Sequence, residues 1–198
     1  LTYATLGAFL KYPWLATVAK SGATPRRDKF SAFGAEHSAF EEVCRATGLR
    51  ARGDNFFARH PLTFLVEAAD DFCYAIIDLE DGLEMDLLHW QEVYPLLQPI
   101  LPRNDEVKHL VQSDFRPGRK AALLRGSIIE NFIDAGVQAF MQQHDRLLAG
   151  EIDTDLISLC AAPVRDVVEG SKQLAKTRVF EHPRKIELEI GAYQVIGT

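Results

Sequence analysis

The stretch RHPLTFLVEAADDFCYAIIDLEDGLE, from Arg59 to Glu84, decides the fold of this 198-residue chain. At about 100° per residue, the advance of an α-helix, its side chains separate onto an apolar and a polar face. A long amphipathic helix is therefore predicted, beginning at Pro61 because proline is favoured in the first turn. We expect its apolar face to be Leu62, Leu65, Val66, Ala69, Phe72, Cys73, Ile76 and Ile77. The polar face collects Glu67, Asp70, Asp71, Tyr74, Asp78 and Asp81.

Carboxylates that follow one another along a helix face repel each other, so something must offset the repulsion. Water, basic side chains and a bound cation are the three candidates, and a solvated charged face is the ordinary explanation. Two details favour a site. Tyr74 lies inside the acidic set, and the helix itself supplies no Lys or Arg between Pro61 and Glu84. The periodicity thus indicates a site but specifies no reaction.

Helical spacing recurs along most of the chain. Further helices are predicted for residues 1–11, 34–49, 87–101, 119–148, 152–159 and 162–180. The segment from Lys20 to Phe30 is rich in Gly, Ser, Pro and basic residues, which is typical of a surface loop. Only KIELEI, Lys185–Ile190, alternates with the period of a strand. The predicted fold class is all-α, a single helical region over residues 1–198, with one short β element near the C-terminus.

Composition narrows the class of protein. With 47% hydrophobic residues the chain can bury a core, and its formal charge of −6 argues against general nucleic-acid binding. Cys44, Cys73 and Cys160 lack metal-site spacing, so we expect reduced core thiols in a cytoplasmic protein. No apolar run approaches the roughly 18 residues of a membrane span. The chain opens without Met and in mid-pattern, so we expect a piece of a larger protein.

The run HPLTFLVEAADDFCYAIIDLEDGLE, His60–Glu84, resembles the most recognisable helix of bacterial deoxyguanosinetriphosphate triphosphohydrolase-like proteins, a branch of the HD-domain phosphohydrolases. In that family the run is close to H-P-L-x-x-L-V-E-A-A-D-D-I-x-Y-x-I-x-D-L-E-D. Leu1–Pro13 and Val179–Gly197 resemble the family's flanking parts, and residues 88–119 match it least. The resemblance implies a portion of an HD-domain-like helical bundle.

The resemblance also implies a chemistry and a set of site residues. Such enzymes hydrolyse deoxynucleoside triphosphates, dGTP-like in this case, to deoxynucleoside and tripolyphosphate with a divalent metal, Mn²⁺ or Mg²⁺. Asp70 matches a metal ligand, and Tyr74 and Asp78 match residues that line the deoxyribose. The family's phosphate contacts match Lys11, Tyr12 and Lys29.

The family's upstream His and His-Asp metal motif is absent from these residues. No catalytic residue is therefore assigned here, and we expect residues 1–198 alone to be inactive. His60 is expected to belong to the turn that starts the helix rather than to a metal site.

The resemblance implies a homo-oligomer, with single-stranded DNA or a nucleotide as effector and no membrane partner. The alternative is a non-catalytic helical module for oligomerisation or regulatory nucleotide binding, which keeps the long helix for packing alone. Tyr74 and Asp78 beside Asp70 favour the enzyme, because packing does not require these residues on a polar face.

Overall fold

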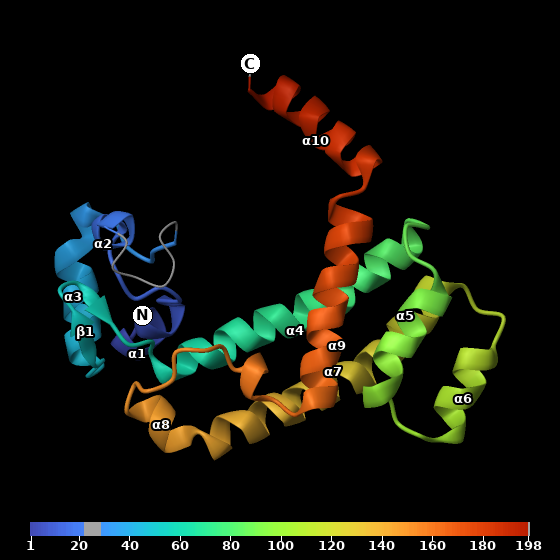
Figure 1. Ribbon diagram of the computed structural model, residues 1–198, viewed down its shortest axis with the longest axis horizontal. Coiled ribbons are helices and arrows are strands. Elements are labelled where there is room, and N and C mark those ends of the chain that lie inside the picture. The colour runs from blue at the N-terminus through green and yellow to red at the C-terminus, as the bar shows by residue number, and fades with distance from the viewer. Residues whose placement is uncertain (22–28, 198) are drawn as a thin grey trace. The chain divides into compact units, whose positions relative to one another are not determined.

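The computed structural model describes residues 1–21 and 29–197, which are mostly helical (Figure 1). The α-helices are α1 Tyr3–Phe9, α2 Ala16–Ser21, α3 His37–Ala46, α4 Pro61–Glu84, α5 Trp90–Leu97, α6 Asp105–Gln112, α7 Pro117–Gln142, α8 His144–Leu148, α9 Ala162–Ala175 and α10 Pro183–Ile196. Short helical turns are η1 Gly34–Glu36, η2 Gln98–Ile100, η3 Ile157–Leu159 and η4 Lys176–Phe180. The predicted all-α class is confirmed. None of the described helices is long and apolar enough to cross a membrane.

The predicted C-terminal strand is wrong, because Lys185–Ile190 lie within α10. The N-terminus of α10 is capped, because the His182 side chain accepts a hydrogen bond from the Arg184 backbone N–H. Pro183 occupies the first turn, where proline is favoured. Lys185 Nζ also lies 2.7 Å from the Glu189 carboxylate, one turn further on. Six residues are too few to separate the two periods, and the cap together with this i,i+4 pair favours the helix.

The strands lie instead in a small hairpin that the sequence patterns missed. β1, Ala51–Gly53, pairs antiparallel with β2, Phe56–Phe57. Asn55 has φ 54°, in the left-handed region that Asn tolerates better than most residues, and it turns the chain between the strands. Strands of two and three residues are too short to show an alternating pattern. The signal available was the turn-forming pair Asp54-Asn55.

Several helix boundaries also differ from the predictions. The predicted helix over 119–148 is divided into α7, which ends at Gln142, and α8, which begins at His144. The helix predicted for 152–159 is reduced to η3. Helix α6 was not predicted, although Asn104 caps it by accepting the Val107 N–H at 2.8 Å. The predicted loop between Lys20 and Phe30 lies largely outside the described residues.

The chain divides into two compact units, the first comprising Leu1–Ala69 and Gly136–Leu159. Its core contains Leu15, Ala32, Phe40, Cys44 and Phe57. Trp14 lies edge-on to Phe56 with the ring centroids 5.2 Å apart, and its Nε1–H donates to the Lys29 carbonyl at 2.6 Å. The Phe57 N–H donates to the Pro13 carbonyl at 3.0 Å. These contacts hold the segment after α1 against the hairpin.

The second unit comprises Asp70–Ala135 and Cys160–Thr198. Phe72 of α4 stacks on Phe132 of α7, with ring centroids 4.8 Å apart. Lys120 of α7 is buried, and its Nζ donates to the Val111 carbonyl near the end of α6 at 2.8 Å. The same ammonium lies 5.6 Å from the Trp90 ring of α5. One buried cation thus ties α5, α6 and α7 together by satisfying a helix-end carbonyl.

Helix α4 continues through both units and buries a face that matches the prediction only in part. Its buried apolar residues are Phe64, Ala68, Phe72, Ala75, Ile76, Leu79 and Leu83. Of the predicted apolar face, the exposed residues are Leu62, Val66, Ala69, Cys73 and Ile77. The apolar residues of this helix cover a wider arc than its buried residues do. Periodicity therefore predicts the polar stripe, but it does not predict which of the apolar residues are buried. Cys73 is therefore not a core thiol as predicted, whereas Cys44 and Cys160 are buried.

Candidate functional site

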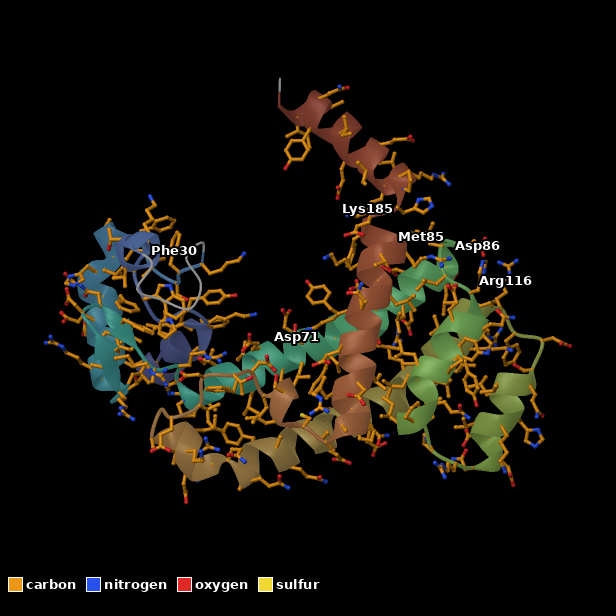
Figure 2. All side chains as sticks on the ribbon, in the orientation of Figure 1. Phe30, Asp71, Met85, Asp86, Arg116 and Lys185 are labelled. Carbon is orange, nitrogen blue, oxygen red and sulfur yellow. The ribbon has the colours of Figure 1, made fainter. Side chains whose placement is uncertain are left out.

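The acidic residues of α4 lie on one side of the helix, as the periodicity predicts. We call the following residues the acidic stripe: Glu67, Asp70, Asp71, Tyr74, Asp78 and Asp81. Figure 2 labels Asp71 on α4. Its carboxylate lies 2.8 Å from Lys172 Nζ of α9, and Glu67 has two basic partners. Basic side chains from other elements thus offset part of the repulsion. Among the residues that the structure describes, no Lys or Arg forms an ion pair with Asp70, Asp78 or Asp81.

Asp78 opens onto a cavity of about 590 Å³ in the second unit. Its lining includes Asp78, Asp81, Met85, Phe180, Arg184 and Lys185. Partial burial raises the pKa of the Asp78 carboxyl, and the neighbouring Asp81 charge raises it further. Tyr74, one turn earlier on α4, is 56% exposed. A half-buried carboxylate beside apolar walls can accept a hydrogen bond from a hydroxyl group.

A second cavity, of about 330 Å³, lies in the first unit, and we call it the Lys11 cavity. Its lining includes Lys11, Tyr12, Trp14, Arg52, Arg59 and Glu67. The Tyr12 and Trp14 rings are 5.6 Å apart at their centroids, so the lining combines aromatic rings with charged side chains. Two of the three predicted phosphate contacts, Lys11 and Tyr12, are therefore brought together in one cavity.

Glu67 joins two of the cations of the Lys11 cavity. One carboxylate oxygen lies 3.2 Å from Lys11 Nζ, and the other accepts a hydrogen bond from Arg59 Nη1 at 2.6 Å. Arg59 Nη2 also donates to the carbonyls of Asp153 and Thr154, at 3.1 and 2.7 Å. Two cations hold the Glu67 carboxylate in place, and its side chain is only 13% exposed, so water screens its negative charge only weakly.

Lys29, the third predicted phosphate contact, does not line the Lys11 cavity. Its side chain is exposed, and its backbone carbonyl accepts the Trp14 Nε1–H. The loop that precedes it, residues 22–28, lies outside the described residues. A phosphate contact by Lys29 stays a prediction.

The described residues do not form a metal centre by themselves. Within residues 1–21 and 29–197, no three His, Cys, Asp or Glu side chains gather closely enough to hold a metal ion. A divalent ion at Asp70 would need further ligands from outside this set. His60, as expected, belongs to the start of α4, where its Nδ1 accepts the Leu62 N–H at 3.2 Å. Burial lowers the pKa of this imidazole.

Sequence reasoning missed the two arginines of the Lys11 cavity. Arg59 stands next to His60 at the helix start, and only the folded chain brings it to Glu67, eight residues away. Arg52 lies on the hairpin, where it is ion-paired with Asp153 and donates to the Gly150 carbonyl at 2.7 Å. A prediction of the hairpin would have placed Arg52 on the strand that pairs with Phe56–Phe57. No sequence pattern indicates the residues that line the Lys11 cavity, because they come from four separate segments of the chain.

Comparisons with known proteins connect the chain to one group of relatives. It is 41% identical over 198 residues to a deoxyguanosinetriphosphate triphosphohydrolase-like protein of Pseudomonas aeruginosa, covering 99% of this chain and 44% of the relative. A protein of the same name from Synechocystis is 33% identical over all of this chain and 44% of its own length. A deoxyguanosinetriphosphate triphosphohydrolase of Yersinia pestis is 27% identical, again over all of this chain and 41% of the relative.

No family model matches the chain. The chain spans less than half the length of these curated relatives, and the similarity covers nearly every residue of it. The resemblance to deoxyguanosinetriphosphate triphosphohydrolase-like proteins, first indicated by the run from His60 to Glu84, is therefore confirmed.

Proposed function

We propose that this chain forms the substrate-lining part of a deoxynucleoside triphosphate triphosphohydrolase that acts on dGTP-like substrates. The products are the deoxynucleoside and tripolyphosphate. The observation that carries the proposal is the 41% identity, over 99% of the chain, to a protein named deoxyguanosinetriphosphate triphosphohydrolase-like. A divalent ion, Mn²⁺ or Mg²⁺, would supply an activated water and polarise the attacked phosphate when bound. Asp70 would contribute one of its ligands.

The residues of the acidic stripe have separate tasks in this proposal. The Tyr74 ring packs over the deoxyribose, and the Asp78 carboxylate accepts a hydrogen bond from the 3′-hydroxyl. Their separation of one helical turn supports this division, since side chains at i and i+4 are neighbours on the helix surface. A ribose 2′-hydroxyl would then clash with Tyr74 or remain unpaired against it. An unpaired polar group costs roughly 1–3 kcal/mol, which corresponds to about 5- to 150-fold in selectivity.

The Lys11 cavity supplies the phosphate contacts. The Lys11 ammonium and the Tyr12 hydroxyl donate to phosphate oxygens, which favours a substrate that carries several negative charges. Lys29 adds a further contact from the neighbouring loop. The intact protein is a homo-oligomer in this proposal and acts in the cytoplasm, with single-stranded DNA or a nucleotide as effector.

The test compares kcat/KM for dGTP, GTP and 2′,3′-dideoxy-GTP in the intact protein. Tyr74→Ala should narrow the preference for dGTP over GTP. Asp78→Asn should reduce turnover of dGTP while leaving the dideoxy analogue relatively unaffected, because that analogue has no 3′-hydroxyl. Asp71→Asn is the matched control: it removes a charge from the same stripe, but Asp71 pairs with Lys172 and does not line the Asp78 cavity, so the three ratios should be unchanged.

Unchanged ratios in the Tyr74 and Asp78 variants would show that the acidic stripe does not face the sugar. Absence of any triphosphohydrolase activity in the intact protein would favour the alternative, a helical module for oligomerisation or regulatory nucleotide binding.

A further inference from the structure

The Glu67 carboxylate is paired with Lys11, the cation that the proposed function assigns to a phosphate. It lies 3.2 Å from Lys11 Nζ and 2.6 Å from Arg59 Nη1, and its side chain is only 13% exposed. Nothing in the sequence pattern separates Glu67 from the other acids of the stripe. The structure does, because Glu67 lines the Lys11 cavity and the remaining acids of the stripe do not.

The two cations that share Glu67 are held very differently. Arg59 is fixed by its bonds to two backbone carbonyls, and its guanidinium lies 4.4 Å from the Phe64 ring. Lys11 is 39% exposed and ends in a compact ammonium on a flexible four-carbon chain. The flexible Lys11 side chain can therefore turn towards an entering anion, whereas the Arg59 guanidinium is fixed by its bonds to the two carbonyls. Glu67 and an entering anion therefore compete for Lys11 rather than for Arg59.

The charges that line the Lys11 cavity cancel. The three cations Lys11, Arg52 and Arg59 face the three carboxylates Glu67, Asp153 and Asp155. Asp153 pairs with Arg52 and is 73% exposed, so water screens much of its charge. The Glu67 side chain is less exposed to water than that of Asp153, so its charge is screened less and repels an anion at Lys11 more strongly.

We propose that Glu67 is the affinity-determining counter-ion of this cavity, which competes with a polyphosphate for Lys11 and so weakens its binding. The inference rests on the proposed function, in which Lys11 contacts the triphosphate. Such a group has a physical use. Tight binding of the tripolyphosphate product would slow turnover, and a counter-ion that takes back the ammonium favours release.

The experiment measures binding of sodium tripolyphosphate to the intact protein by isothermal titration calorimetry at low salt. Four forms are compared: wild type, Glu67→Gln, Lys11→Met and the double variant. Gln keeps the size of Glu and can still present its carbonyl oxygen to Arg59. Glu67→Gln should bind tripolyphosphate about threefold to tenfold more tightly, as expected for removing one like charge a few ångströms from the anion. Lys11→Met should weaken binding, and in its background Glu67→Gln should have little effect.

Asp153→Asn serves as the matched control, since it removes a carboxylate of the same cavity that is not paired with Lys11. Its effect should be smaller than that of Glu67→Gln. Weaker binding by Glu67→Gln, an equal gain in the Lys11→Met background, or an equal gain from Asp153→Asn would each overturn the counter-ion role while leaving the phosphate site standing. Lack of tripolyphosphate binding by the wild type, or unchanged binding by Lys11→Met, would instead remove the phosphate site itself and the inference with it.

Discussion

Asp70 and Asp71 are adjacent in the sequence but have different surroundings, so exchanging each for Asn should give different results. Asp71 pairs with Lys172 at 2.8 Å, and the two side chains are 24% and 43% exposed. A partly exposed pair of this kind contributes about 0.2–1 kcal/mol to stability. For a chain of this length, 1 kcal/mol corresponds to about 2–4 °C in Tm. Asp71→Asn should therefore lower Tm by up to about 4 °C and leave metal binding intact.

Asp70→Asn should show the opposite pattern. Asp70 is exposed, and no described basic side chain pairs with it, so its loss should change the free energy of unfolding by less than about 0.5 kcal/mol. In the intact protein the same change should abolish turnover and binding of Mn²⁺, because the amide replaces an anionic ligand.

Thermal unfolding and Mn²⁺ titration of both variants make the assay. Lys172→Met is the control for the ion pair: it should reproduce the Tm decrease of Asp71→Asn, and the double variant should not add the two decreases. Equal loss of Mn²⁺ from the Asp70 and Asp71 variants would refute the assignment of Asp70 as the metal ligand. A Tm decrease confined to Asp70→Asn would refute the structural role of the Asp71–Lys172 pair.

Two further predictions concern titration and thiol reactivity. Burial lowers the pKa of His60 below its ordinary value of 6.5, so as the pH falls the unfolded chain is protonated at this residue before the folded chain. The free energy of unfolding should therefore fall as pH drops below about 6.5 and level off below the pKa of the folded state. Urea denaturation across pH 4–8 should show this dependence, and His60→Gln should reduce it. Cys73 is exposed, whereas Cys44 is fully buried and burial raises the pKa of its thiol to about 12. A thiol reagent followed by peptide mass spectrometry should therefore label Cys73 well before Cys44, and faster labelling of Cys44 would contradict the burial of α3.

The helical class and the acidic stripe were predictable from the sequence because both depend on local spacing. From Pro61 to Glu84 the polar residues repeat at helical intervals, and that repeat exists before any tertiary contact forms. The same local reasoning failed at Lys185–Ile190, where a six-residue alternation was weaker than a cap and an i,i+4 ion pair. It also missed a hairpin of five strand residues, which is too short for a pattern.

Only the tertiary structure decided which apolar side of α4 is buried and which basic residues meet its acids. Phe64 and Leu79 are buried while Val66 and Ile77 are exposed, although all four are apolar, because the choice depends on the helices that pack against α4. The partners of the acidic stripe are likewise distant in sequence: Lys172 reaches Asp71, and Lys11 reaches Glu67. Helical periodicity fixes the direction of a side chain from its own axis, but the identity of the group that it meets depends on chain segments that fold back from far away.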